Sequence, residues 1–123
     1  MANNIILVVD DSKTDYLYVK KILDQGGYTV AYADSGERAL EEAKRLSPDC
    51  IIMDVVMPQM NGFQATRALG KDPATQQIPV IMLSSKSDQI DKVWAERQGA
   101  TDYVVKPANP KELLTKVMAV VGA

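Results

Sequence analysis

Five short apolar runs, separated by segments in which apolar residues recur at helical spacing, constrain the fold of this 123-residue chain more than any other feature. Short apolar runs of this kind are typical of strands that are buried on both faces. Because strands that alternate with helices are joined by right-handed crossovers, the pattern predicts an α/β fold with a single five-stranded parallel sheet and helices on both faces. The expected strands are 5–9, 28–33, 50–53, 78–83 and 103–105.

The segments between the strands carry signals for the ends of helices. Residues with N-cap chemistry precede four of them, and Asp34 with Glu37 has the spacing of a capping box. The expected N-caps are Ser12, Asp34, Asn61 and Asn109. In the last two helices, apolar residues are expected to share one face: Ile90, Val93 and Trp94, and then Leu113, Leu114, Val117, Met118 and Val121.

Size and composition favour one globular domain that spans residues 1–123. Hydrophobic residues make up 46% of the chain and charged residues 24%, which is too apolar for a disordered segment. The net charge of −2 gives no electrostatic reason to expect nucleic-acid binding, and no apolar run is long enough for a signal or membrane segment. We expect a cytoplasmic protein without an appended output module, because the pattern ends with the last helix.

The chain contains no histidine and a single cysteine. The absence of histidine excludes a Ser-His-Asp triad, a histidine-bound metal and a phosphohistidine carried on this chain. Cys50 lies in an expected buried strand, which predicts a small core residue and not a disulfide partner or a reactive thiol. Any chemistry must therefore come from carboxylates, hydroxyls, lysine and a cation that prefers oxygen ligands.

Four of the five expected strands end in polar residues that are suited to one site. They are, in strand order, Asp10-Asp11, Asp54, Ser84 and Lys106. The carboxyl ends of parallel strands lie on one edge of the sheet, so these side chains can converge. Two carboxylates at 4 Å repel by roughly 1 kcal/mol in water, which a divalent cation would relieve. Mg²⁺ is the natural candidate, and a carboxylate that the metal does not fully use can attack phosphorus.

The joint pattern resembles that of the response-regulator receiver domains, which include the CheY-like chemotaxis regulators, over the whole chain. The resemblance rests on Asp10-Asp11, on the Asp-x-x-Met-Pro-x-x-Asn-Gly motif that begins at Asp54, on Ser84 and on Lys106-Pro107. It implies a flavodoxin-like (βα)5 fold and a receiver domain over residues 1–123.

The resemblance also implies the chemistry of the acidic residues. Asp54 would be the phosphoacceptor. Asp10, Asp11 and Asp54 would bind Mg²⁺ together with the backbone carbonyl of Val56. The chain would be a phosphoacceptor that catalyses its own phosphorylation and dephosphorylation, and not an enzyme that acts on another substrate.

The remaining matched residues would form a switch. Lys106 would pair with the phosphoryl group, and Ser84, which stands where threonine is more frequent, would move to hydrogen-bond it. Tyr103 matches the aromatic residue whose rotamer follows that movement. The face formed by the fourth helix, the fifth strand and the fifth helix would then change its affinity for a protein target.

Two segments, 61–67 and 91–100, resemble the stand-alone receivers of type IV pilus (twitching motility) chemosensory systems. This narrower resemblance implies a chemotaxis-type sensor histidine kinase as the phosphodonor and a role in pilus-mediated or chemotactic motility. Trp94 lies in the second segment, where it is either a partner contact or partly buried packing.

Four other interpretations are open on the sequence. Asp54 alone is explained equally well as an aspartate that caps a turn. A Mg²⁺-dependent phosphohydrolase with an aspartate nucleophile would need a second aspartate where Val56 stands. A flavodoxin-like cofactor binder would need a hydroxyl- and glycine-rich loop after the first strand, where Asp10-Asp11 would repel phosphate. A receiver could also act only as a phosphate sink for its kinase.

Overall fold

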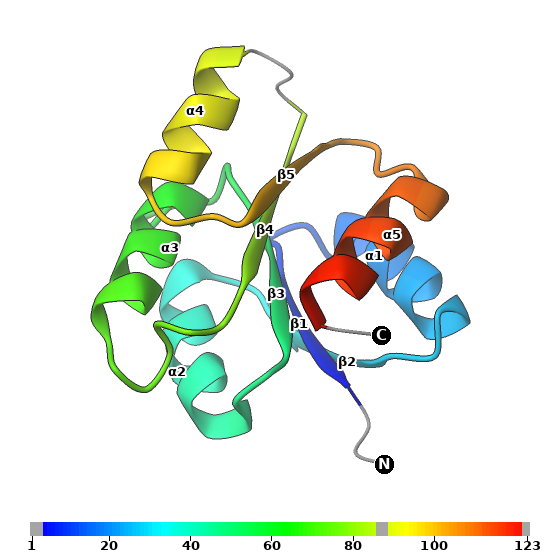
Figure 1. Ribbon diagram of the computed structural model, residues 1–123, viewed down its shortest axis with the longest axis horizontal. Coiled ribbons are helices and arrows are strands. Elements are labelled where there is room, and N and C mark those ends of the chain that lie inside the picture. Colours follow the sequence, from blue (N-terminus) through cyan, green and yellow to red (C-terminus); the bar gives the residue numbers. More distant parts are fainter. Residues whose placement is uncertain (1–3, 86–88, 122–123) are drawn as a thin grey trace.

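The computed structural model describes residues 4–85 and 89–121. Within these residues, five strands alternate with five helices (Figure 1). In chain order the elements are β1 (Ile5–Val9), α1 (Lys13–Gln25), β2 (Thr29–Ala33), α2 (Gly36–Leu46), β3 (Cys50–Asp54), α3 (Gly62–Lys71), β4 (Val80–Ser84), α4 (Gln89–Arg97), β5 (Asp102–Val105) and α5 (Pro110–Val121).

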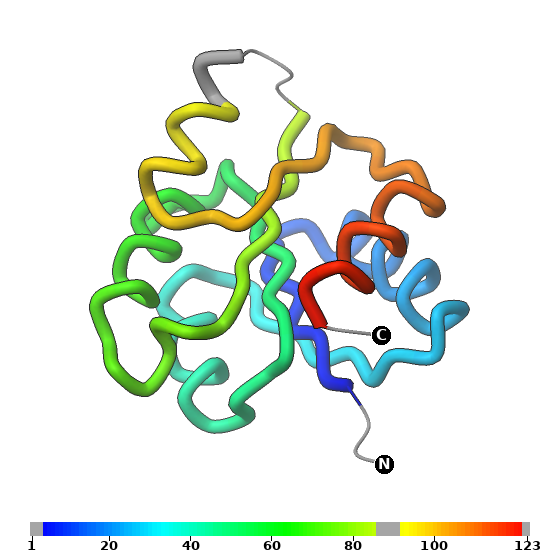
Figure 2. Tube along the Cα trace, viewed as in Figure 1, coloured from blue at the N-terminus to red at the C-terminus, as the bar shows by residue number. Residues whose placement is uncertain are grey.

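All five strands form one parallel sheet in the order β2-β1-β3-β4-β5. The chain trace in Figure 2 returns through a helix between successive strands. Because every strand runs in the same direction, the residues that follow all five strands lie along one edge of the sheet. The predicted α/β fold is confirmed.

The helices cover both faces of the sheet (Figure 1), with α2, α3 and α4 on one face and α1 and α5 on the other. Successive residues of β3 alternate between the two resulting core layers: Ile51 and Met53 pack on the side of α2 and α3, whereas Cys50 and Ile52 pack on the side of α1 and α5. Cys50 is fully buried, as predicted, and burial raises the pKa of its thiol to about 12.

Two element boundaries differ from the predictions for reasons that the hydrogen bonds show, and several other strand ends differ by one residue. The N-cap of α2 is Ser35 and not Asp34, because the Ser35 hydroxyl accepts a hydrogen bond from the Arg38 N–H at 3.1 Å and the helix begins at Gly36. Strand β4 begins at Val80, two residues later than expected. Pro79 has no N–H to donate to a strand ladder, and the N–H of Ile78 is bonded to the Thr75 carbonyl instead.

The apolar faces of the last two helices are narrower than predicted. Leu113 and Val117 of α5 are fully buried, but Met118 is 50% exposed because it lies about 100° around the helix from Val117. In α4, Ala95 is buried whereas Trp94 is 48% exposed and Val93 is 40% exposed, so the face on which these two residues were expected lies largely outside the core. The side chain of Ile90 lies outside the described residues.

Candidate functional site

Three carboxylates meet at the carboxyl edge of the sheet. Asp10 and Asp11 follow β1, and Asp54 is the last residue of β3, the neighbouring strand. One oxygen atom from each of the three lies within 4.8 Å of the other two. The convergence of these carboxylates, predicted because parallel strands end on one edge of the sheet, is therefore present, and oxygen ligands at this separation suit a hard divalent cation.

Two of these carboxylates are buried. Asp10 is 1% and Asp54 is 5% exposed, whereas Asp11 is exposed to solvent. Burial raises the pKa of Asp54 from 3.8 to about 6, although the hydrogen bond from Lys106 acts in the opposite direction. Burial also raises the pKa of Asp10. The folded protein therefore disfavours the ionised form of Asp54, and a bound cation would stabilise that form.

Lys106 connects the buried carboxylates. Its Nζ lies 3.0 Å from Oδ1 of Asp54 and 3.1 Å from Oδ2 of Asp10. Its backbone N–H donates to the Ser84 carbonyl at 2.7 Å, so β4 holds the start of the loop that carries it. Burial lowers the pKa of this ammonium, but its carboxylate partners outweigh that effect and raise the pKa above its ordinary value. Lys106 is therefore a fixed positive charge beside Asp54.

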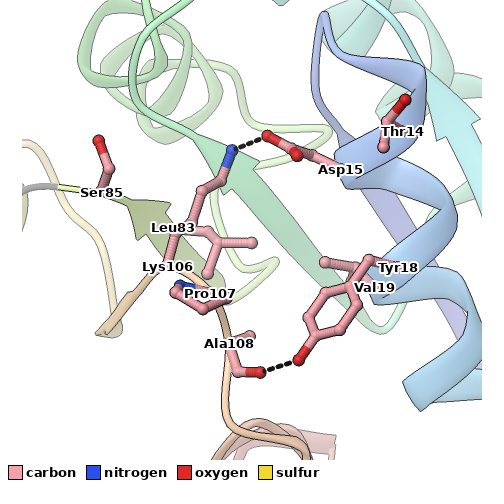
Figure 3. Close-up of a pocket in the computed structure, with 9 residues that line it drawn as sticks. All are labelled: Thr14, Asp15, Tyr18, Val19, Leu83, Ser85, Lys106, Pro107 and Ala108. Carbon is pink, nitrogen blue, oxygen red and sulfur yellow. Dashed lines mark hydrogen bonds and ion pairs between the residues drawn. The ribbon is translucent and has the colours of Figure 1, made fainter.

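A fourth acid that the sequence reasoning missed also reaches Lys106. Oδ2 of Asp15, in the first turn of α1, lies 2.9 Å from Nζ (Figure 3). Asp15 stands three residues after the N-cap Ser12, where an acid usually caps the helix. This local role gave no reason to expect a contact with Lys106. The sequence carries no signal for this choice, because it depends on Asp10 Oδ1, which accepts the Ser12 N–H at 2.9 Å and leaves Asp15 to reach Lys106.

Gly62 allows helix α3 to begin directly against β3, the strand that carries Asp54. A Cβ atom at this position would lie 2.2 Å from the Asp54 carbonyl oxygen, so no larger residue fits without moving backbone. The Gly62 N–H donates to the Val55 carbonyl at 2.8 Å. Asn61 and Gln64 form a reciprocal capping box at the same helix end. The Asn-Gly pair of the motif thus fixes the segment that leaves β3.

The remaining predicted residues surround this cluster. A cleft of about 340 Å³ opens above it, and it is lined by Asp10, Asp11, Ser12, Asp15, Asp54, Val56, Ser85 and Lys106. Val56 is 62% exposed, so its side chain lies in solvent at the cleft, and Ser84 at the end of β4 is 1% exposed. Ser85, and not Ser84, lines the cleft.

Tyr103 lies on β5 with its side chain 8% exposed, packed in the core layer of α2 and α3. Its carbonyl accepts a hydrogen bond from Lys116 Nζ at 3.1 Å, and the same ammonium pairs with Asp102 at 2.9 Å. The ring of Tyr103 therefore lies in the core and not at the surface.

The family of the chain follows from comparison with known proteins. A family model described as the response regulator receiver domain matches residues 6–118. The chain belongs to this family. It is also 45% identical over 117 residues to protein PilH of Pseudomonas aeruginosa, a match that covers 95% of this chain and 97% of PilH.

Solved structures agree with this assignment. Chemotaxis protein CheY4 of Vibrio cholerae is 35% identical, with a TM-score of 0.90, and the match covers 97% of this chain and 99% of CheY4. The receiver domain of sensor histidine kinase PA1611 from Pseudomonas aeruginosa is 29% identical, also with a TM-score of 0.90, over 99% of this chain and 100% of that domain. The crystal structure of that domain has a magnesium ion coordinated in its active site cleft.

Two further findings concern the length of other relatives and the character of the helices. The chain also matches the alkaline phosphatase synthesis transcriptional regulatory protein PhoP of Bacillus subtilis and the DNA-binding response regulator MtrA of Mycolicibacterium smegmatis, but it spans only about half of their length. Within residues 4–85 and 89–121, none of the helices has the length and apolar character that a membrane crossing requires.

Proposed function

We propose that residues 1–123 act as a single-domain response regulator that accepts a phosphoryl group on Asp54 from a phosphohistidine of a sensor histidine kinase. The observation that carries this proposal is the convergence of Asp10, Asp11 and Asp54 beside a lysine ammonium 3.0 Å from Asp54. A turn-capping aspartate does not require these partners. The chain has no histidine, so the phosphodonor must be another molecule.

The transfer step uses the carboxylate as a nucleophile. An oxygen of Asp54 attacks phosphorus, the phosphorus–nitrogen bond to the donor histidine breaks, and its electron pair remains on the imidazole nitrogen. Lys106 is placed to stabilise the charge on the transferring group. Asp10, Asp11, Asp54 and the Val56 carbonyl would hold Mg²⁺. When bound, the ion would neutralise the carboxylates and the phosphoryl oxygens.

The output of this chemistry is a change at the face formed by α4, β5 and α5. A phosphoryl group on Asp54 adds charge and strong acceptors, which draw the Lys106 ammonium and the Ser84 hydroxyl toward it. Movement at the ends of β4 and β5 then alters the surroundings of Tyr103, a residue of β5 that pairs with Met82 of β4 and packs in the core layer of α2, α3 and α4. This biases a two-state element toward binding a protein target.

We further propose that the phosphodonor is a chemotaxis-type histidine kinase and that the protein acts in pilus-mediated motility. Support comes from the 45% identity with PilH over nearly the full length of both chains, and from the likeness to CheY4. A phosphate sink in the same system is the second candidate, because the match covers 97% of PilH and therefore lies almost entirely within the receiver domain.

The test is the intact mass of the protein after incubation with acetyl phosphate and Mg²⁺. One added phosphoryl group is expected in the wild type and none in Asp54→Asn or in the presence of EDTA. Asp72→Asn, at a partly exposed carboxylate outside the cluster, is the matched control and should be phosphorylated normally. An adduct that persists in Asp54→Asn would refute the assignment of the acceptor.

A wild type that gains no mass is then tested with beryllofluoride and Mg²⁺, which bind without hydrolysis. Amide chemical shifts around Asp54 and in α4, β5 and α5 are expected to change together. If neither reagent has an effect, the site does not accept phosphoryl groups and the proposed function is wrong.

A further inference from the structure

Asp15 and Lys106 are separated by 91 residues in the sequence but lie in direct contact. Figure 3 shows the Asp15 carboxylate pointing away from α1 toward the lysine ammonium. The three carboxylates attributed to metal binding and phosphorylation do not include Asp15, so the proposed function gives this ion pair no role. The side chain of Asp15 is 49% exposed, whereas that of Lys106 is 18% exposed. Asp15 therefore covers the solvent side of the ammonium.

The start of α1 leaves the Asp15 carboxylate free to make this contact. The Ser12 hydroxyl accepts the Asp15 N–H at 3.3 Å, which is the first half of a capping box. The second half would be a bond from the Ser12 N–H to the Asp15 carboxylate. Asp10 Oδ1 already accepts that N–H at 2.9 Å, so Asp15 has no capping partner and turns to Lys106.

The contact with Asp15 completes the hydrogen bonding of the lysine. An ammonium has three donors, and Lys106 has three carboxylate partners within 3.1 Å, which are Asp10, Asp15 and Asp54. A phosphoryl group can therefore accept a hydrogen bond from this ammonium only if it displaces one of these three carboxylates. Asp15 is the partner that lies farthest toward solvent and is the one not attributed to Mg²⁺ or to phosphorus.

The same face of α1 holds the loop at a second point. The Tyr18 hydroxyl, one helical turn after Asp15, donates to the Ala108 carbonyl at 2.7 Å. The two contacts lie on either side of a cavity of about 460 Å³ between α1 and the 106–108 segment (Figure 3). Helix α1 thus restrains the backbone of the loop as well as its lysine.

We propose that Asp15 is a positioning residue that restrains Lys106 in the unphosphorylated protein by competing with the phosphoryl group for the lysine ammonium. This inference rests on the proposed function of Asp54. It implies that Asp15 slows phosphorylation in two ways. It occupies a donor that the phosphoryl group needs, and it places an additional negative charge near an anionic phosphodonor.

The experiment compares the rate of phosphorylation by acetyl phosphate, at saturating Mg²⁺, in the wild type and three variants. Asp15→Asn keeps the size of the side chain and removes its charge, and it is expected to raise the rate roughly three- to tenfold. Asp15→Glu keeps the charge and should remain near the wild-type rate. Asp24→Asn is the matched control, because it removes an exposed charge from the same helix, where Asp24 pairs with Lys20. Its rate should equal that of the wild type.

Salt dependence separates this role from a purely structural one. The advantage of Asp15→Asn should shrink at about 0.5 M salt, because exposed charges are then screened over a few ångströms. A change in helix stability alone would not respond in this way. An unchanged or lower rate in Asp15→Asn, or an equal rise in Asp24→Asn, would overturn the proposal.

A second measurement does not depend on phosphorylation. Hydrogen exchange of the Lys106 ammonium, followed by nitrogen-15 NMR of the side chain, should be several times faster in Asp15→Asn than in the wild type and unchanged in Asp24→Asn. If neither acetyl phosphate nor beryllofluoride has an effect on the wild type, the proposed function fails, but this exchange rate still decides whether Asp15 restrains the lysine. Equal exchange in Asp15→Asn and the wild type would refute the restraint.

Discussion

Asp54→Asn is expected to stabilise the metal-free protein. The carboxylate is 5% exposed, and burial raises its pKa from 3.8 to about 6. A group whose pKa is higher in the folded state binds protons more readily there, so its ionisation lowers stability as the pH rises from the unfolded pKa through the folded pKa. A shift of about two pKa units corresponds to about 3 kcal/mol, reached once the pH is above 6. Asparagine removes the ionisation and keeps an oxygen that accepts from Lys106.

The assay is urea unfolding followed by far-UV circular dichroism in EDTA. At a pH of about 7.5, the variant should exceed the wild type by up to about 3 kcal/mol in free energy of unfolding, and at a pH of about 4.5 by only about 1 kcal/mol. Asp72→Asn is the control of opposite sign, because the Ala74 N–H and Lys44 lower the pKa of that carboxyl. Because the ionised carboxylate of Asp72 stabilises the folded state, Asp72→Asn should destabilise the protein, and more so at the higher pH.

The reasoning would be refuted by a difference between Asp54→Asn and the wild type that is independent of pH. In that case Lys106 would compensate fully for the burial of the charge. Addition of Mg²⁺ gives a further check. The ion should stabilise the wild type by linkage and close part of the gap, since the variant lacks one of the proposed ligands.

Three further outcomes are expected. Lys106→Ala should still gain a phosphoryl group in the mass assay but should no longer show coupled amide shifts in α4, β5 and α5; retained coupling would remove Lys106 from the switch. Gly62→Ala should lower the free energy of unfolding in urea by more than about 2 kcal/mol, because the added Cβ would lie 2.2 Å from the Asp54 carbonyl oxygen. Gly70→Ala is the control: an added Cβ there has no neighbour within 4 Å, so this change should be neutral or stabilising. Cys50, which is fully buried and whose thiol pKa burial raises to about 12, should react with a thiol reagent only in denaturant, and rapid reaction in buffer would contradict the burial.

The sheet and the acidic cluster were predictable because both depend on short-range patterns. Apolar runs such as 5–9 and 50–53 indicate buried strands, and parallel strands must place the residues that follow them on one edge. Asp10 and Asp54 therefore converge whatever the details of the helices. Strand order adds that β1 and β3 are neighbours, which brings these two carboxylates close enough to share a cation.

The contact between Asp15 and Lys106 was not predictable in the same way. A residue in the first turn of a helix has a local role available, and spacing along the chain favours that role. The choice between capping the helix and reaching Lys106 depends on which acceptor takes the Ser12 N–H, and this is a competition between side chains in three dimensions. The exposed Met118 has a similar origin, because a residue one position from the buried Val117 is covered only if a neighbouring element lies there.

The short strand β5 gives the proposed switch a direct physical route between its two ends. Lys106 follows the last residue of the strand and pairs with Asp54, whereas Lys116 of α5 holds the first two residues through the Asp102 carboxylate and the Tyr103 carbonyl. The strand has four residues, a span of about 13 Å at roughly 3.3 Å per residue. A strand paired along its length with β4 moves as a unit more readily than it stretches. A displacement of Lys106 toward a phosphoryl group would therefore also shift Asp102 and Tyr103, the residues of β5 that Lys116 of α5 contacts.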